Sequence, residues 1–221
     1  MLSVLSDLTQ QANIPVVGIV GGVGAGKSSV VRTVPDLQLC VIDADHIGHE
    51  LLFRNDIRSK LGDAFGEEIF DEAGQVLRAR LAEKVFGDSD EQTNNRKRLN
   101  EILHPAIRTE IQRSIKQAPQ DVDAIILDAA LLLETGLADE CDAVIFIDTP
   151  VELRQQRASA NRGWSMEEFQ RREASQWSLL KKRQHAQFVV DNSGSQKAAA
   201  EQMTLVLKKI IERHGASGLL L

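Results

Sequence analysis

The stretch that decides the fold reads Gly21-Gly22-Val23-Gly24-Ala25-Gly26-Lys27-Ser28. It fits the pattern G-x-x-x-x-G-K-[ST], and it lies between an apolar β-branched run, Val16–Val20, and a helix-like run that begins at Ser28. Glycines in this pattern let successive backbone N–H groups turn inward around phosphate oxygens, and the helix that follows offers its positive end. The stretch therefore predicts a phosphate-binding loop between a strand and a helix.

This loop predicts the binding of a nucleoside triphosphate. Lys27 is expected to reach the β- and γ-phosphates, and the Ser28 hydroxyl is expected to ligate Mg²⁺. Glycine-rich turns without a ligand are common, but four glycines followed by Lys-Ser in this setting favour a nucleotide site. The residues expected to bind the nucleotide are Gly22, Val23, Gly24, Ala25, Gly26, Lys27, Ser28 and Ser29.

Length and charge limit the possible functions. A chain of 221 residues is expected to form one α/β domain with insertions. Its net charge is −6 and it has no long basic run, so we expect no nucleic acid as partner. The sequence gives no sign of an obligate protein partner. No stretch approaches about eighteen consecutive apolar residues, so no membrane association is expected. Cys40 and Cys141 stand in apolar, strand-like contexts and are expected to be small buried residues of a cytoplasmic protein.

Five short apolar runs alternate with helix-like segments along the chain. They are Val16–Val20, Leu39–Ile42, Ala124–Leu127, Ala143–Ile147 and Phe188–Val190. Continuous β-branched runs separated by helical crossovers predict an α/β fold, a five-stranded parallel sheet with helices on both faces. Four of the five runs are followed directly by an aspartate, namely Asp43, Asp128, Asp148 and Asp191. Because ligands of open α/β sheets bind at the carboxyl ends of the strands, we expect the chemistry at this edge.

The segment between the second and third runs is too long for a single crossover. Apolar residues recur in it at every fourth position, which predicts a helix through Leu99, Leu103, Ile107, Ile111 and Ile115. Pro105 must begin a new helix or kink an existing one. We interpret residues 54–118 as a helical insertion that binds the acceptor.

Two carboxylates follow the second run as Asp43-Ala44-Asp45, with His46 and His49 close behind. One aspartate could hold Mg²⁺ while the other accepts a proton from an acceptor hydroxyl. Two alternatives stay open, a helix cap and a transition-metal site that includes the histidines. Asp128 ends a run with the shape of a Walker-B strand, where an aspartate orients the Mg²⁺ shell.

Arginines cluster in the last third of the chain, where they flank a predicted helix cap at Ser165. They are Arg154, Arg157, Arg162, Arg171 and Arg172. An arginine on a mobile lid stabilises the charge of a transferring phosphoryl group, and we favour this over a solvated helix face with ion pairs. Upstream, Thr149 is predicted to cap a helix in a capping box with Glu152. The expected organisation is an N-terminal extension over 1–14, a core over 15–53, 119–158 and 184–221, the insertion over 54–118 and a lid over 159–183.

With these residues in place, the chain resembles the dephospho-coenzyme A kinase family. The resemblance covers most of the chain and includes G-I-V-G-G-V-G-A-G-K-S at 18–28, D-A-D-H-I at 43–47, H-E-L at 49–51, L-H-P at 103–105, L-L at 131–132 and D-N-S-G at 191–194. Arg78, Glu134, Arg157, Arg172 and Gln176 also match. Many kinases share the first motif, but D-A-D and L-H-P together are narrow.

The resemblance implies a P-loop NTPase fold like that of nucleoside-monophosphate kinases, with core, acceptor domain and lid. It implies transfer of a phosphoryl group from MgATP to the ribose 3′-hydroxyl of dephospho-coenzyme A, the last step of coenzyme A synthesis. Asp45 would be the base, with Lys27 and Arg157 as further catalytic residues. Arg157 and Asn192 would contact ATP. The acceptor set would be Asp43, Asp45, His49, Arg78, His104 and Glu134, and the Mg²⁺ set Ser28, Asp43 and Asp128.

The chain departs from the family pattern at several positions. Ala130 stands where the family usually has proline, Arg154 where it has glutamine, and Gln187 where it often has aspartate. The step from Arg157 to Arg162 also looks one residue longer than usual, which leaves the role of Arg162 open.

Two other functions deserve comparison with this one. A kinase for another hydroxyl, such as that of a sugar or nucleoside, fits the loop, but the long insertion favours a large acceptor. A GTP-dependent switch fits D-x-x-G at residues 71–74, but no N-K-x-D motif for guanine selection follows.

Overall fold

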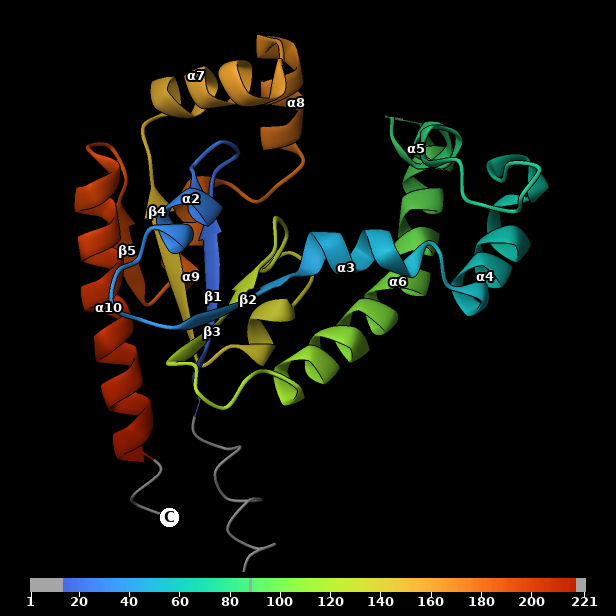
Figure 1. The fold of residues 1–221 in the computed structure, drawn as a ribbon. Helices are drawn as coiled ribbons and strands as arrows, with labels where there is room; N and C mark the ends of the chain where they lie inside the picture. Colours follow the sequence, from blue (N-terminus) through green and yellow to red (C-terminus); the bar gives the residue numbers. More distant parts are fainter. Residues whose placement is uncertain (1–13, 88, 218–221) are drawn as a thin grey trace, which may run out of the picture. The chain divides into compact units, whose positions relative to one another are not determined.

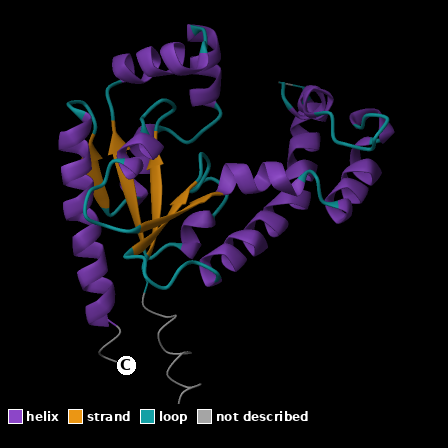
Figure 2. Cartoon of the chain, viewed as in Figure 1, coloured by secondary structure: helices purple, strands orange, loops and turns teal. Residues whose placement is uncertain are grey.

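The structure is a computed structural model that describes residues 14–87 and 89–217. Its strands form one sheet and are β1 Val16–Gly21, β2 Leu39–Asp43, β3 Ala124–Asp128, β4 Ala143–Asp148 and β5 Phe188–Asp191. The strand order is β2-β3-β1-β4-β5, and every pairing is parallel. All five predicted runs are strands, and the predicted parallel sheet is confirmed (Figure 2).

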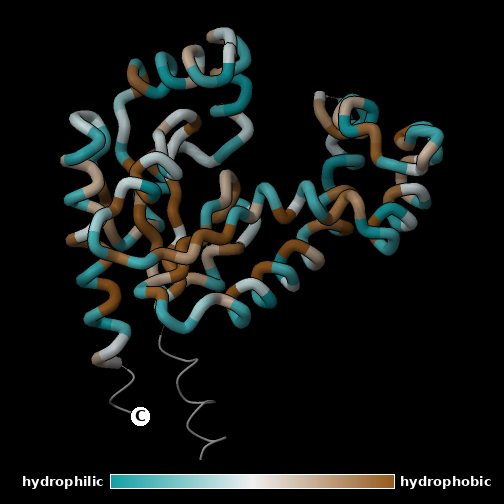
Figure 3. Tube along the Cα trace, viewed as in Figure 1, coloured by the Kyte–Doolittle hydropathy of each residue, from teal (hydrophilic) through white to brown (hydrophobic). Residues whose placement is uncertain are grey.

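The central strand β1 is buried along its whole length, as expected for a parallel sheet covered on both faces. Val17 and Ile19 point to one face, where they pack with residues of α2 (Lys27–Arg32) and α10 (Gln196–Ser217). Gly18 faces the other side, where a Cβ would lie 2.7 Å from a methyl group of Leu132. In Figure 3 the hydrophobic colour follows the strands of this sheet.

The remaining helices lie in the long segments between strands. They are α3 Ala44–Leu51, α4 Asn55–Phe65, α5 Arg78–Val85, α6 Asp90–Lys116, α7 Val151–Arg162, α8 Met166–Ala174 and α9 Leu179–His185, with short 3₁₀ turns at Glu67–Ile69 and Leu137–Glu140 (Figure 1). Pro105 lies inside α6, so the helix predicted from the apolar stripe continues through the proline. Leu99, Leu103 and Ile107 of that stripe pack against the hydrophobic core of their unit.

The described residues form two compact units. One unit runs up to Asp43 and resumes at Ser114, and the other comprises Ala44–Arg113. The second unit has a hydrophobic core of its own, which includes Ile57, Leu61, Phe65, Leu81 and Val85. This unit, Ala44–Arg113, overlaps most of the predicted insertion over 54–118 and also includes α3. The predicted extension, residues 1–14, lies outside the described residues except for residue 14.

Two local expectations are wrong. Thr149 does not cap a helix, because α7 begins after Pro150 without a side-chain cap and the Thr149 hydroxyl instead donates to the carbonyl oxygen of Ala25 at 3.0 Å. A buried carbonyl needs a donor, and this need outweighs the local capping pattern. Cys40 and Cys141 are free thiols as expected, but both are partly exposed rather than buried.

Ser165 is the N-cap of α8 as predicted, and its hydroxyl oxygen accepts a hydrogen bond from the Glu168 amide at 3.2 Å. Within residues 14–87 and 89–217, no helix combines the length and apolar character needed to span a bilayer.

Candidate active site

The phosphate loop joins β1 to α2 and depends on glycine at two positions. Gly24 and Gly26 have φ angles of 74° and 80°, which lie in the left-handed region that favours glycine. Neighbouring groups also exclude a side chain there. A Cβ on Gly24 would lie 2.4 Å from the carbonyl oxygen of Arg154, and one on Gly26 would lie 2.9 Å from the amide nitrogen of Asn192. The sequence pattern therefore reflects both the turn and the close packing around it.

The carbonyl oxygen of Ala25 accepts the hydrogen bonds that hold this loop in place. It accepts hydrogen bonds from the Asn192 side-chain amide at 2.8 Å, from the Thr149 hydroxyl at 3.0 Å and from a guanidinium nitrogen of Arg157 at 3.3 Å. Thr149 follows β4, Asn192 follows β5 and Arg157 lies in α7. Three separate elements thus hold one peptide group.

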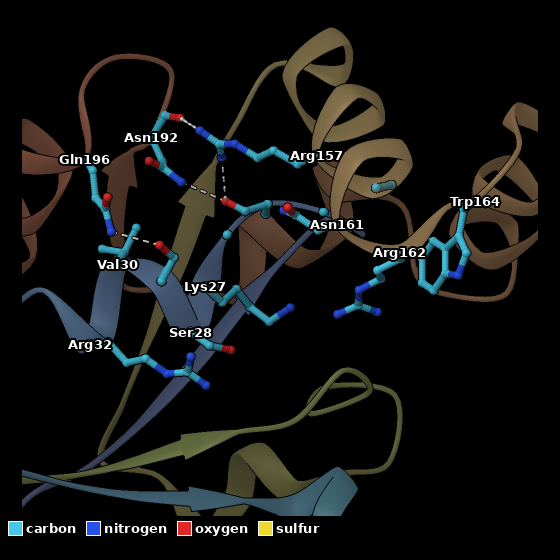
Figure 4. Close-up of a pocket in the computed structure, with 15 residues that line it drawn as sticks. Lys27, Ser28, Val30, Arg32, Arg157, Asn161, Arg162, Trp164, Asn192 and Gln196 are labelled. Atoms are coloured by element: carbon cyan, nitrogen blue, oxygen red, sulfur yellow. Dashed lines mark hydrogen bonds between the residues drawn. The ribbon is translucent and has the colours of Figure 1, made fainter.

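A pocket of about 520 Å³ opens over the loop (Figure 4). Most of the predicted nucleotide-binding residues line it, namely Gly24, Ala25, Gly26, Lys27, Ser28, Ser29, Arg157 and Asn192. Gly22 and Val23 are not among the residues that line it. The sequence did not point to four further polar or aromatic side chains that line the pocket, namely Arg32, Asn161, Trp164 and Gln196. Gln196 donates to the Ser29 hydroxyl at 2.9 Å and so ties the first residues of α10 to the loop.

Oxygen ligands gather beside the loop. The Ser28 hydroxyl donates to a carboxylate oxygen of Asp128 at 2.7 Å, and Asp128 pairs in register with Asp43 on the neighbouring strand. Hydroxyl and carboxylate oxygens are the ligands that Mg²⁺ prefers. Among the described residues, no three His, Cys, Asp or Glu side chains come together as a metal site, so the transition-metal alternative has no support there.

Arg154 has a role that the sequence did not reveal. Its side chain is only 3% exposed, and its guanidinium donates to the carbonyl oxygens of Thr149 at 3.1 Å and Val23 at 3.3 Å. It also pairs with Glu173 and lies over the Phe169 ring. Arg154 therefore stabilises the loop through a buried hydrogen bond to the Val23 carbonyl. A residue type that is usually exposed gives no sequence signal for such burial.

Glu134 takes part in a second buried contact that the sequence did not predict. One of its carboxylate oxygens accepts from the Trp177 amide at 2.8 Å and lies 3.2 Å from the ammonium of Lys182, whose side chain is 1% exposed. Lys182 also donates to the Gln176 side chain at 2.7 Å. Burial lowers the pKa of Lys182, and the Glu134 charge opposes this shift. The other carboxylate oxygen of Glu134 is buried and has no hydrogen-bond partner within the part of the chain that the structure describes.

The second unit contains several residues of the predicted acceptor set. His49, near the end of α3, lies with Nε2 3.0 Å from a guanidinium nitrogen of Arg78, the first residue of α5. Because arginine can only donate, Nε2 accepts, and the proton of the neutral ring is on Nδ1. Asp45 lies in the first turn of α3. His104 is half-buried in α6, and burial lowers its pKa, so that its ring is neutral near pH 7.

Comparison with known proteins identifies the family. The family model described as dephospho-CoA kinase matches residues 15–198. The chain belongs to the dephospho-CoA kinase family. The resemblance in the motifs is thereby confirmed.

Individual relatives agree with this assignment. A dephospho-CoA kinase from Carboxydothermus hydrogenoformans is 35% identical over 198 residues, which cover 89% of this chain and 94% of the relative. One from Corynebacterium diphtheriae is 38% identical over 182 residues, 81% of this chain and 89% of the relative. The crystal structure of TT1252 from Thermus thermophilus matches with a TM-score of 0.74 at 27% identity and covers 89% of this chain and 98% of that one. The predicted fold class is therefore confirmed.

The contact between Glu134 and Lys182 predicts a large effect on stability. Lys182→Ala leaves the Glu134 carboxylate buried without its cation, and removing one member of a buried ion pair costs about 3–5 kcal/mol. We expect the free energy of unfolding, measured by urea denaturation followed by circular dichroism, to fall by that amount.

Lys181→Ala is the matched control, because this neighbouring lysine is exposed and only lies over the Trp177 ring. Its loss should cost about 1 kcal/mol or less. Equal stabilities of the two variants would show that the ion pair contributes nothing.

Proposed function

We propose that this protein transfers the γ-phosphoryl group of ATP to the ribose 3′-hydroxyl of dephospho-coenzyme A, giving ADP and coenzyme A. Membership of the family supports this reaction class. The observation that carries the proposal is the contact of 2.7 Å between Ser28 and Asp128, which joins the phosphate loop to the end of β3. This contact brings together the two groups that a P-loop kinase uses beside its nucleotide phosphates.

On the nucleotide side, the residues from Gly24 to Ser29 bind the ATP phosphates through backbone N–H groups, and Lys27 pairs with the β- and γ-phosphates. Ser28, Asp43 and Asp128 hold Mg²⁺ directly or through water. When bound there, Mg²⁺ would supply positive charge against the phosphates of the nucleotide. Hydroxyl and carboxylate oxygens such as these suit this ion.

On the acceptor side, Asp45 accepts the proton of the 3′-hydroxyl as it attacks the γ-phosphorus. Arg78 binds an acceptor phosphate, and the contact with His49 fixes the direction of its guanidinium. His104 completes the acceptor set in this unit, whereas the Glu134 carboxylate is engaged by Lys182 and the Trp177 amide. A neutral His104 suits hydrogen bonding to a hydroxyl or amide of the acceptor rather than pairing with a phosphate.

The proposal is tested by product analysis. The purified protein is incubated with ATP, MgCl₂ and dephospho-coenzyme A, and products are identified by ³¹P NMR and mass spectrometry. We expect ADP together with a new 3′-phosphate monoester on the coenzyme, and loss of turnover when EDTA removes Mg²⁺. Phosphorylation of a nucleoside or sugar, with dephospho-coenzyme A left unchanged, would overturn the proposal.

Asp45→Asn tests the assignment of the base. The change preserves shape and removes the proton acceptor, so ATP binding should survive while kcat falls by about 10²–10⁴. We expect the smaller loss in this range, because in a loose phosphoryl transition state little proton transfer to a base has taken place. The measurement is kcat at saturating substrates, with the ATP Kd from calorimetry.

Asp43→Asn is the comparison variant, and its activity should depend on the Mg²⁺ concentration more than on the acceptor. If Asp45→Asn kept more than about a third of the wild-type kcat, the loss would fall far outside the range of general-base catalysis and Asp45 would not be the base.

Arg78→Ala tests the acceptor site. A hydrogen bond to a charged group is worth about 1.5–3 kcal/mol, so the KM for dephospho-coenzyme A should rise about 10- to 100-fold while the ATP Kd stays the same. Arg80→Ala is the control, because this exposed arginine of the same helix donates to the Glu68 carbonyl and is not in the predicted acceptor set. A larger effect of Arg78→Ala on ATP than on the acceptor would place Arg78 on the wrong substrate.

A further inference from the structure

Trp164, in the turn from α7 to α8, contacts two arginines. The guanidinium carbon of Arg162 is 4.7 Å from the centre of the Trp164 ring, and that of Arg172 is 4.2 Å from it. Both distances lie within the range of a cation–π contact. The ring is half-buried and packs against the small hydrophobic cluster of Val23, Ala158 and Phe169. Trp164 therefore contacts two guanidinium groups and a hydrophobic cluster, which together restrict the position of its ring.

The backbone of the turn fixes the ring as well. Gly163 ends α7 in the left-handed region with a φ of 64°, and its amide donates to the Ser159 carbonyl at 2.9 Å. Ser165, one residue beyond Trp164, caps α8. The tryptophan therefore stands between a defined helix end and a defined helix start.

Arg162 differs from the other late arginines in its partners. Arg154 pairs with Glu173, Arg171 and Arg172 pair with Glu168, and Arg157 donates to two backbone carbonyls. Within residues 14–87 and 89–217, the Arg162 guanidinium contacts the Trp164 ring and forms no hydrogen bond or ion pair with another residue. Its N–H donors are therefore left for a ligand.

Arg162 and Trp164 line the same pocket as Lys27 and Ser28. Figure 4 shows the Arg162 side chain running from the tryptophan toward the open space into which Lys27 also extends. Two cations that face one space without a carboxylate between them favour an anion there. Within the pocket over the phosphate loop, that anion is the phosphate chain of the nucleotide.

We propose that Trp164 is a positioning residue that holds Arg162 in this pocket, where Arg162 contacts the transferring phosphoryl group. The inference rests on the proposed phosphoryl transfer. It assigns to Arg162 the role that the sequence suggested for Arg157, whose guanidinium is engaged by the carbonyls of Ala25 and Asn192. Without the ring, a long exposed side chain would lose rotamer freedom each time it reached the phosphate.

The test compares kcat with nucleotide affinity in four variants. Arg162→Ala should lower kcat by about 10³-fold, the lower end for an arginine on a transferring phosphoryl group. Trp164→Leu keeps a hydrophobic side chain but removes the π face, and kcat should fall roughly 3- to 30-fold. Trp164→Phe should recover part of that loss, since phenylalanine offers a weaker face. Arg113→Ala, which removes an exposed arginine that pairs with Glu110 in α6, should match wild type.

The Kd of ADP, measured by calorimetry, separates positioning from plain binding. ADP lacks the transferring group, so its Kd should stay within about twofold of wild type in all four variants. A wild-type kcat for Trp164→Leu and Trp164→Phe would overturn the proposal. A raised Kd of ADP with an unchanged kcat would also overturn the proposal, because it would show that the Trp164 ring stacks on the adenine of the nucleotide. Thermal melting confirms folding, and Trp164→Phe carries the test if Trp164→Leu fails to fold.

The same comparison distinguishes this inference from the proposed function. If wild type used another acceptor in place of dephospho-coenzyme A, the proposed function would fail, and the variants would be compared with that acceptor. If the variants showed the same losses of kcat with that acceptor, the roles of Trp164 and Arg162 would be supported. If these losses did not appear, both roles would be contradicted.

Discussion

The hydrogen bonds to the carbonyl oxygen of Ala25 are the interaction on which the active site depends. Donors from the ends of β4 and β5 and from α7 converge on this one atom. In a trans peptide the C=O and the next N–H point in opposite directions. Fixing the carbonyl of Ala25 therefore directs the amide of Gly26 the other way, as required of a donor to phosphate. The sheet order β3-β1-β4-β5 makes this possible, because it sets the ends of β4 and β5 beside the loop.

The same constraint links the loop to the helices after it. Arg154 and Arg157 stand three residues apart on one face of α7, and each donates to a carbonyl of the loop. Arg154 also forms an ion pair with Glu173 of α8. Arg162, the last residue of α7, contacts Trp164 in the turn between these helices. The segment predicted as a lid is thus attached to the phosphate loop through the pair of Arg154 with Glu173, and Arg162 near its start has no hydrogen bond or ion pair within the described residues. A buried guanidinium requires full pairing, which the two carbonyls and the carboxylate supply.

Local patterns predicted most of the fold. Short runs of apolar, largely β-branched residues were enough to locate all five strands, because this composition favours a strand even in the partly exposed edge strands β2 and β5. The glycine pattern located the loop for a similar reason, since backbone conformation and phosphate binding require the same residues. Contacts between distant residues were not predictable. Thr149 looked like a helix cap because its neighbours fit one, and its bond to Ala25 depends on the sheet order. Lys182 and Glu134, far apart in the chain, became a pair only in the folded core.

The most direct measurement is ATP turnover and thermal melting of Lys27→Ala. The account claims that the loop fastened at Ala25 is where the triphosphate binds and reacts. Lys27 is a partly exposed residue of that loop and contributes little to the core, so its loss should abolish turnover and leave the melting temperature unchanged. Turnover near that of wild type, at an unchanged melting temperature, would contradict the account.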